Sequence, residues 1–398
     1  MLKLLKIIKG IEMLRKKIYF INFLPIILIS INLRAPITSV GPIANLLQEY
    51  YGLSAAQAGL LTSLPLLAFG IVSFLVALLQ PIRAMFFGLL CIIFGELLRC
   101  LGDSTILFIG TAIMGSGIAI ANVLLPSFVK AKFPREIPKI MGIYSLILNI
   151  SAALGILAIV PLTHIMSLPL AFGCWVILAL LAFISYIPQI KNRRILRPKQ
   201  KLAHKKTLFA NIHAWKITLF MGLQSTMAYS FFAWYPSLLI DYGFDRLFIA
   251  RIMLTTQCVI IPLSIIIPLW LHSLPQKLRN IFIVVICMLY ATSYLLLLFS
   301  HEVWSIVLAS CLLGIPLGGV FSVALLFISS KSANVFIATK LSAMSQGVGY
   351  LMASIFPWVI GKLYDCYHSF NYALILLIFL SLLLNIVGYY AQKVVSIE

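Results

Sequence analysis

Arg34 is the residue whose position in this chain most directly implies chemistry. It follows Asn32 and Leu33 inside the first long apolar stretch, residues 18–47, and lies far from both ends of that stretch. A guanidinium does not lose its proton in a protein, and placing one at the centre of a bilayer costs about 2.5–3.5 kcal/mol on insertion scales. Such a residue normally faces an aqueous cavity or an anion. The sequence therefore predicts a solute site in mid-membrane, with Arg34 as its first candidate ligand.

Polar side chains in the other apolar stretches could complete such a site. The amides Asn122, Gln224 and Gln346 can donate hydrogen bonds to an anion or a polarised group. Amides also join membrane helices to one another, for about 0.6 kcal/mol each, and Tyr and Trp often mark the membrane surface, so a structural role is the alternative at each position. The candidate substrate-binding residues are Asn32, Arg34, Thr38, Asn122, Gln224, Tyr229, Trp234, Gln346 and Tyr350.

The titratable residues offer few other sites. Glu96 is the carboxylate that we place within an apolar stretch, and Arg99 follows it at the i, i+3 spacing of a helical ion pair. We expect that pair to be self-contained and close to the outer surface, which leaves Arg34 without an obvious protein partner. Two alternatives stay open: Glu96 carries a coupling proton, or Arg34 bonds backbone carbonyls. The six histidines fall in or near loops without metal-ligand spacing, so we expect neither a metal nor a cofactor.

The elements that must position these residues are membrane-spanning helices. The 398-residue chain is 62% hydrophobic and 10% charged, whereas soluble domains carry about 25% charge. Its apolar residues recur in blocks of about 20, each long enough to cross a hydrocarbon core. The expected spans cover residues 18–47, 54–79, 84–101, 105–129, 140–160, 169–190, 214–240, 247–271, 280–300, 303–329, 341–361 and 371–391.

The charges predict the orientation of these spans. The net charge is +20, but most basic residues fall in the gaps on the side of the two termini, which the positive-inside rule places in the cytoplasm. That distribution argues against nucleic-acid binding. The predicted organisation is a basic cytoplasmic N-terminus (1–17), a six-helix bundle (18–190), a basic cytoplasmic linker (191–213), a second six-helix bundle (214–391) and a cytoplasmic tail (392–398). For residues 1–17, an amphipathic helix on an anionic leaflet and translation from Met13 both stay open.

The two halves also echo each other in sequence. Tyr51-Gly52-Leu53-Ser54 leads into the second span, and Tyr242-Gly243-Phe244-Asp245 leads into the eighth. Parallel six-helix halves related about the membrane normal describe the major facilitator architecture. We therefore expect an all-α membrane protein with the twelve-helix major facilitator fold, built from two six-helix bundles.

Five motifs carry a more specific resemblance. They are Asn32-Leu33-Arg34 with Thr38-Ser39-Val40-Gly41-Pro42, Leu125-Pro126-Ser127-Phe128-Val129-Lys130, Met141-Gly142-Ile143-Tyr144-Ser145, Gly222-Leu223-Gln224 with Ala233-Trp234-Tyr235-Pro236, and Lys340 to Tyr350. In this order they resemble the cyanate permease and nitroimidazole transporter family of the major facilitator superfamily. The resemblance implies transport of cyanate-like anions or small nitrogen-containing organics. The chain departs from the family's pattern where Ala35 separates Arg34 from Pro36, and where the loop between the second and third spans shrinks to Gln80-Pro81-Ile82-Arg83.

The predicted function is therefore transport rather than catalysis. No nucleophile elbow, P-loop or dinucleotide fingerprint appears, which argues against an enzyme or an ATP-driven pump. We expect a monomeric secondary active or facilitative transporter in the bacterial inner membrane, working by alternating access on a small-molecule solute. Proton coupling and direction stay open. The alternatives are an exporter of neutral drug-like compounds or metabolites, in which Arg34 is structural, and a membrane solute sensor that does not transport.

Overall fold

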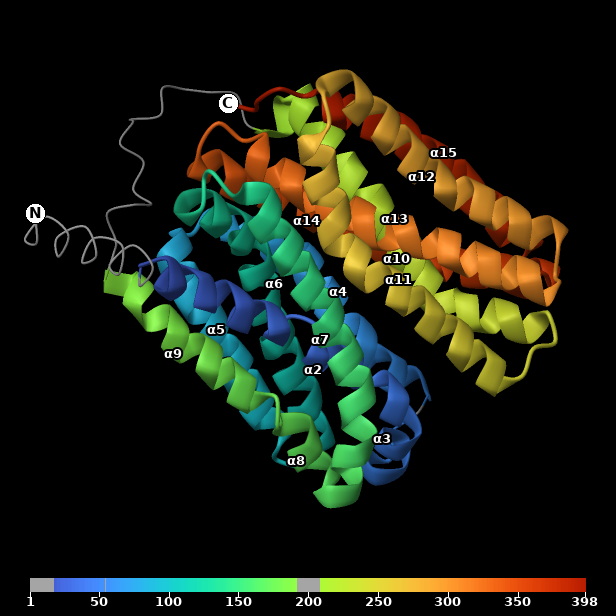
Figure 1. The fold of residues 1–398 in the computed structure, drawn as a ribbon. Coiled ribbons are helices and arrows are strands. Elements are labelled where there is room, and N and C mark those ends of the chain that lie inside the picture. Colours follow the sequence, from blue (N-terminus) through green and yellow to red (C-terminus); the bar gives the residue numbers. More distant parts are fainter. Residues whose placement is uncertain (1–17, 54, 192–207) are drawn as a thin grey trace, which may run out of the picture.

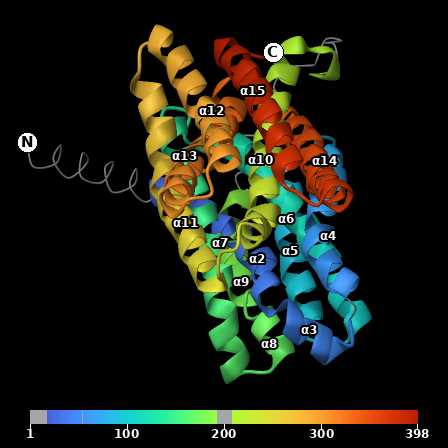
Figure 2. The same cartoon turned by 90° about the vertical axis from the view of Figure 1, so that its right-hand side faces the viewer.

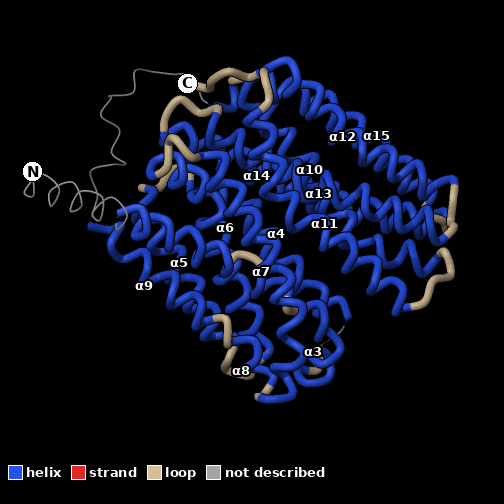
Figure 3. The backbone as a smooth tube through the Cα atoms, viewed as in Figure 1, coloured by secondary structure: helices blue, strands red, loops and turns tan. Residues whose placement is uncertain are grey.

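The computed structural model describes residues 18–53, 55–191 and 208–398, and this part of the chain is almost entirely helical (Figure 1, Figure 3). The predicted N-terminal segment, residues 1–17, and most of the predicted linker lie outside the described residues. Two groups of helices follow each other along the chain and pack side by side (Figure 1, Figure 2).

The first group begins with a helix over residues 18–32. It continues with α2 (Ala35–Thr38), η1 (Gly41–Ile43), α3 (Ala44–Tyr51), α4 (Ala55–Val76), α5 (Pro81–Arg99), α6 (Ser104–Lys132), α7 (Ile137–Ile165), α8 (Leu168–Gly173) and α9 (Val176–Lys191). After the 3-10 turn η3 (Leu208–Ala210), the second group comprises α10 (Ile212–Asp241), α11 (Arg246–Ser273), α12 (Gln276–Phe299), α13 (Val303–Ser330), α14 (Val335–Tyr367) and α15 (Asn371–Lys393).

Each expected span corresponds to helical structure. Ten segments of the described chain are long and apolar enough to cross a membrane, and α4 and α10 occupy the positions of the second and seventh expected spans. Large apolar side chains such as Phe94, Phe232 and Phe379 stay exposed on the helix surfaces. A surface of this kind suits lipid, because hydrocarbon tails require no polar groups from the protein.

The first expected span is broken instead of continuous. Its helix ends at Asn32, and after a turn at residues 33–34 a new one-turn helix, α2, begins. Pro36 explains the position of the break, since proline has no N–H to donate to the carbonyl four residues earlier and its ring clashes with that carbonyl. Ser151 on α7 satisfies two freed backbone groups: its hydroxyl accepts from the N–H of Ala35 at 2.9 Å and donates to the carbonyl of Ile31. A broken helix is tolerated at membrane depth where protein groups satisfy its backbone in this way.

The two groups are tied together near one face of the molecule. At the end of α6, the Lys130 ammonium donates to the Ser329 carbonyl on α13 at 2.9 Å, and the Ser329 hydroxyl donates back to the Pro126 carbonyl at 2.9 Å. We call this the terminal face, because the C-terminal tail lies against the α13–α14 turn there. Away from it, the two groups diverge (Figure 1).

The C-terminal tail is itself anchored at the terminal face. Ile397 forms a parallel bridge with Ser332, and the Lys331 ammonium donates to the carbonyls of Gln392 and Val394 at 2.7 and 2.6 Å. Burial, and then the nearby charge of Arg279, lower the pKa of Lys331 to about 8. The tail therefore holds the end of α13, two residues beyond Ser329, in a fixed position.

Candidate functional site

Arg34 lies in the turn between the first helix and α2, where it reaches from the first group of helices into the second. Its Nη1 donates to the Tyr229 hydroxyl on α10 at 2.7 Å. The guanidinium carbon also lies 5.8 Å from the ring centre of Tyr229 and 5.9 Å from that of Phe321 on α13. The break in the first helix thus presents this cation to aromatic rings of the other group, at distances typical of cation–π contacts.

The residues around this cation are phenols and rings rather than acids. The Tyr350 ring on α14 lies 6.0 Å from that of Tyr229 and 5.0 Å from that of Phe69, and the hydroxyls of Tyr350 and Tyr144 are within electrostatic reach of Arg34. Within the described residues, the ion pairs are Glu96–Arg99 and Glu136–Lys139, and neither involves Arg34. Arg34 is also partly exposed to solvent. Its positive charge is therefore not neutralised by any described carboxylate.

Asn122 and Gln346 meet at the junction of the two groups. The Gln346 amide donates to the Asn122 carbonyl at 2.8 Å and to the Ser342 hydroxyl at 2.9 Å. The Asn122 side-chain oxygen accepts from Tyr144 at 2.9 Å, while its Nδ2 is buried and has no acceptor among the described residues. A buried amide N–H without a partner carries a desolvation cost of about 1–3 kcal/mol, which an acceptor on a bound solute would relieve.

Four other candidates face their own group of helices. The Asn32 amide donates to the carbonyls of Leu28 and Leu178, at 2.6 and 3.0 Å. The Thr38 hydroxyl lies near the carbonyls of Arg34, Ala35 and Ala152, at 3.0–3.4 Å. These contacts are the interhelical and backbone bonds that we gave as the structural alternative.

Gln224 and Trp234 also bond within the second group. The Gln224 oxygen accepts from the Tyr290 hydroxyl on α12 at 2.9 Å, and the Trp234 indole donates to the Pro357 carbonyl on α14 at 2.8 Å. Of the nine candidates, the structure brings together Arg34, Tyr229 and Tyr350 as one cluster and Asn122 with Gln346 as a second, linked by Tyr144.

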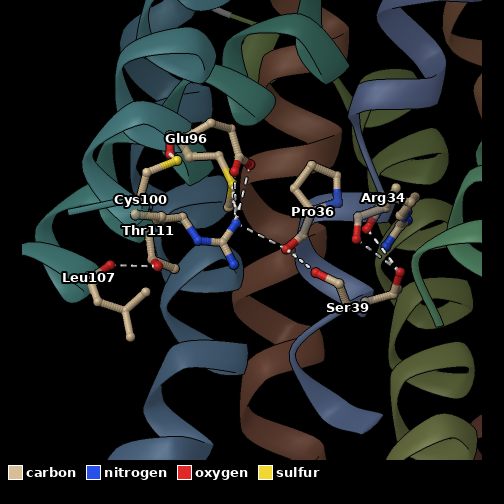
Figure 4. Close-up of polar contacts among 11 residues, drawn as sticks. Arg34, Pro36, Ser39, Glu96, Cys100, Leu107 and Thr111 are labelled. Carbon is tan, nitrogen blue, oxygen red and sulfur yellow. Dashed lines mark hydrogen bonds and ion pairs between the residues drawn. The ribbon is translucent and has the colours of Figure 1, made fainter. Parts of the chain in front are cut away.

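The Glu96–Arg99 pair forms as predicted, but Arg99 has more partners than expected. The two residues do form the predicted i, i+3 ion pair, at 3.1 Å, but both are buried, with side-chain exposures of 0% and 1%. The pair is not self-contained, because Arg99 Nη1 also donates to the Pro36 carbonyl at 3.2 Å. Figure 4 shows Glu96 on one side of Pro36 and Arg34 on the other. The expectation of a self-contained pair was wrong, because the last turn of α5 packs directly against the broken first helix.

Sequence reasoning did not select Phe321 or Tyr144 for the site. Tyr144 lies within one of the five family motifs. Its place in that motif does not reveal that its hydroxyl bonds the Asn122 side chain on another helix. Phe321 lies in the apolar second half of α13, where any phenylalanine fits a lipid or core position equally well. Only the three-dimensional packing of α13 against the first group distinguishes it from the other phenylalanines.

Membrane-length helices in two groups, meeting around an unneutralised cation, define a multi-pass membrane transporter. The chain belongs to the Major Facilitator Superfamily, whose family model matches residues 26–357. A 2-nitroimidazole transporter of Escherichia coli (strain K12) is 32% identical over 382 residues, covering 92% of this chain and 94% of that protein. An uncharacterized transporter of Bacillus subtilis (strain 168), YycB, is 37% identical over 365 residues and 89% of each chain. The cyanate transport protein CynX of Escherichia coli (strain K12) is 28% identical over 348 residues, covering 85% of this chain and 89% of that protein.

Solved structures of the superfamily share the fold. The proton:xylose symporter XylE superposes with a TM-score of 0.78 over 93% of this chain and 95% of its own, at 10% sequence identity. The human organic anion transporter MFSD10 gives a TM-score of 0.71 over 94% of this chain and 99% of its own, at 13% identity. The predicted twelve-helix fold with two six-helix bundles, and the resemblance to nitroimidazole and cyanate transporters, are thereby confirmed. The relatives and the fold are those of small-molecule transporters rather than enzymes.

Proposed function

We propose that this protein carries a small anion or a small nitrogen-containing organic solute across the bacterial cytoplasmic membrane by alternating access, with Arg34 as the principal ligand. The observation that carries the proposal is the Arg34 guanidinium, which is partly exposed at the junction of the two bundles and hydrogen-bonded to the neutral hydroxyl of Tyr229. Since a phenol hydroxyl carries no formal negative charge, this hydrogen bond leaves the positive charge available to a solute.

The names of the relatives support this class of solute. One relative is described as a 2-nitroimidazole transporter and another as a cyanate transport protein. A guanidinium is planar and presents several donors in a fixed arrangement, which suits a nitro group or a small anion. The rings of Tyr229 and Phe321 beside it offer stacking surfaces to a planar solute, and the Asn122 amide offers a donor.

The charge distribution supports an orientation and a conformational state. Basic residues gather in the turns of the terminal face, which places this face in the cytoplasm by the positive-inside rule. The contacts of Lys130, Pro126 and Ser329 then close the cytoplasmic side, and the bundles diverge toward the outside (Figure 1). The arrangement fits the outward-facing state of an alternating-access cycle, which can run in either direction.

The test combines binding and flux. Purified protein is titrated with cyanate and with 2-nitroimidazole in a thermal-shift assay, and uptake of the same compounds is measured in proteoliposomes. We expect Arg34→Ala to weaken binding at least tenfold, because a hydrogen bond to a charged group contributes about 1.5–3 kcal/mol. Arg83→Ala, at an exposed arginine in the first turn of α5, is the matched control and should bind normally.

The other outcomes identify the alternatives. Binding and flux that survive in Arg34→Ala would remove Arg34 from the site and favour an exporter of neutral compounds. Binding without flux in the parent protein would favour a solute sensor.

A further inference from the structure

The Pro36 carbonyl lacks its usual helical donor, because the short helix α2 that follows the break ends at Thr38. In a continuous helix it would accept from the N–H of Val40, but that N–H bonds the Ile37 carbonyl instead, at 3.4 Å. Two side chains replace the missing donor: the Ser39 hydroxyl at 3.1 Å and the Arg99 guanidinium at 3.2 Å. Only one of them, Arg99, comes from another helix.

Arg99 is itself held rigidly. Its Nη1 lies 3.1 and 3.3 Å from the two carboxylate oxygens of Glu96 and 3.1 Å from the sulfur of Met114, and the Phe172 ring covers the guanidinium at 4.5 Å. The surrounding helices cannot shift easily, since α5 and α6 pack so closely that a Cβ at Gly95 would lie 2.5 Å from the backbone nitrogen of Met114. Arg99 therefore connects the broken helix to the most tightly packed part of the first bundle.

The position of Pro36 determines where Arg34 points. The N–H groups of Ile37 and Thr38 both donate to the Arg34 carbonyl, at 3.0 Å, so Arg34, Pro36 and Thr38 form a single turn. A tie at Pro36 fixes that turn, and the turn sends the Arg34 side chain across to Tyr229 in the other bundle.

We propose that Arg99 is a positioning residue for the solute site: by holding the Pro36 carbonyl, it fixes the helix break that presents Arg34. Glu96 balances the charge of Arg99, so that a solute anion is attracted to Arg34 and not to Arg99, which lies on the other side of Pro36. The consequence for solute binding rests on the function proposed above, whereas the effect on the helix break does not.

The test must separate positioning from simple stabilisation of the bundle. Removing one member of a buried pair leaves an unpaired charge and destabilises a protein strongly, but replacing both members by apolar residues of similar size is often neutral. The double variant Glu96→Met/Arg99→Met therefore removes the tie to Pro36 without leaving a buried charge. The matched control is Glu136→Met/Lys139→Met. It removes an exposed i, i+3 ion pair, with an N–O distance of 3.4 Å, that joins the α6–α7 turn to the start of α7.

Hydrogen–deuterium exchange of the full-length protein in nanodiscs gives a readout that needs no solute. In Glu96→Met/Arg99→Met we expect exchange in peptides covering residues 33–43 to rise about tenfold, which is the change for losing one hydrogen bond to a charged group. Exchange in the rest of α5 and α6 should stay unchanged. In the control variant, exchange at residues 33–43 should stay unchanged as well. Binding of 2-nitroimidazole, measured in parallel, should weaken by a similar factor.

Several outcomes would overturn the proposal. They are unchanged exchange at residues 33–43 in a folded double variant, or exchange that rises equally throughout the first bundle. If the double variant does not fold, Glu96→Gln/Arg99→Met replaces it, because a neutral amide at residue 96 leaves no unpaired buried charge while the tie to Pro36 is still removed; unchanged exchange at residues 33–43 in that folded variant would then be decisive against the proposal. If the parent protein binds neither cyanate nor 2-nitroimidazole, the proposed function fails while the exchange result still judges the role of Arg99.

Discussion

At the scale of single residues, the candidate site is defined by polar groups that lack a protein partner: the Arg34 guanidinium has no described carboxylate, and the Asn122 Nδ2 has no described acceptor. The sequence identified Arg34 because an apolar stretch surrounds it, and it identified Asn122 and Gln346 because amides are rare there. It could not show that Gln224 bonds Tyr290 within its own bundle, since helical spacing fixes the face of a residue only relative to its own helix. Neighbours that belong to other helices are set by packing, and this is why Phe321 and Tyr144 were missed.

Asn122 provides a prediction at this scale. Asn122→Asp keeps the oxygen that accepts from Tyr144, so the fold should persist, but it replaces the unpartnered amide N–H groups with a carboxylate. Because Tyr144 is also within electrostatic reach of Arg34, the new negative charge should partly neutralise the guanidinium. We expect binding of cyanate to weaken at least tenfold, with a melting temperature within a few degrees of the parent, measured by isothermal titration calorimetry and thermal unfolding.

The control for Asn122→Asp is Asn371→Asp, at the exposed start of α15. Equal losses of affinity in the two variants would mean that the overall charge of the protein, and not the position of the amide, governs binding.

At the scale of elements, the decisive feature is the interruption of the first helix. Pro36, Gly41 and Pro42 are residue types that weaken a helix, and the structure breaks the first helix after residue 32, four residues before Pro36. What the sequence could not predict is how the break is satisfied, because Ser151 and Arg99 lie on α7 and α5, more than 60 residues away from it. The cause of the break is thus local, whereas its geometry depends on tertiary contacts.

Pro36→Ala should separate stability from function. Alanine restores an N–H that can donate to the Asn32 carbonyl, and it favours the helix by about 3 kcal/mol relative to proline, so the first helix can continue through residue 36. We expect a melting temperature equal to or above that of the parent, and 2-nitroimidazole binding weakened about tenfold, because a continuous helix turns Arg34 away from Tyr229.

The control for this prediction is Pro42→Ala, at an exposed position in η1. It should alter neither quantity, and a Pro36→Ala protein that binds as tightly as the parent would show that the break is not required to present Arg34.

At the scale of the whole molecule, the sequence predicted the number and order of the helices better than their meeting points. Apolar blocks, basic gaps and the repeat of Tyr51-Gly52 as Tyr242-Gly243 gave twelve spans in two halves, because length and hydrophobicity are properties of each segment alone. The reduced loop at residues 80–83 left no visible gate. The structure instead joins the two bundles at the ends of α6 and α13, through contacts with backbone carbonyls that no side-chain motif records. In the proposed alternating-access cycle these contacts form the gate.

This gate leads to a prediction about the balance of conformational states. Lys130 donates to the Ser329 carbonyl across the two bundles, and this bond must break for the terminal face to open. Losing a charge-assisted hydrogen bond of about 1.5–3 kcal/mol shifts a two-state equilibrium roughly 10- to 100-fold. Lys130→Met should therefore raise the population in which this face is open.

Spin labels at Arg135 and Ala333, exposed positions on the two bundles at the terminal face, should report longer distances by double electron–electron resonance. The labels require a background in which the seven native cysteines, all free in the structure, are replaced. Lys139→Met, at an exposed lysine three residues into α7, is the matched control, and a distance distribution that is the same in all three proteins would exclude Lys130 from the gate.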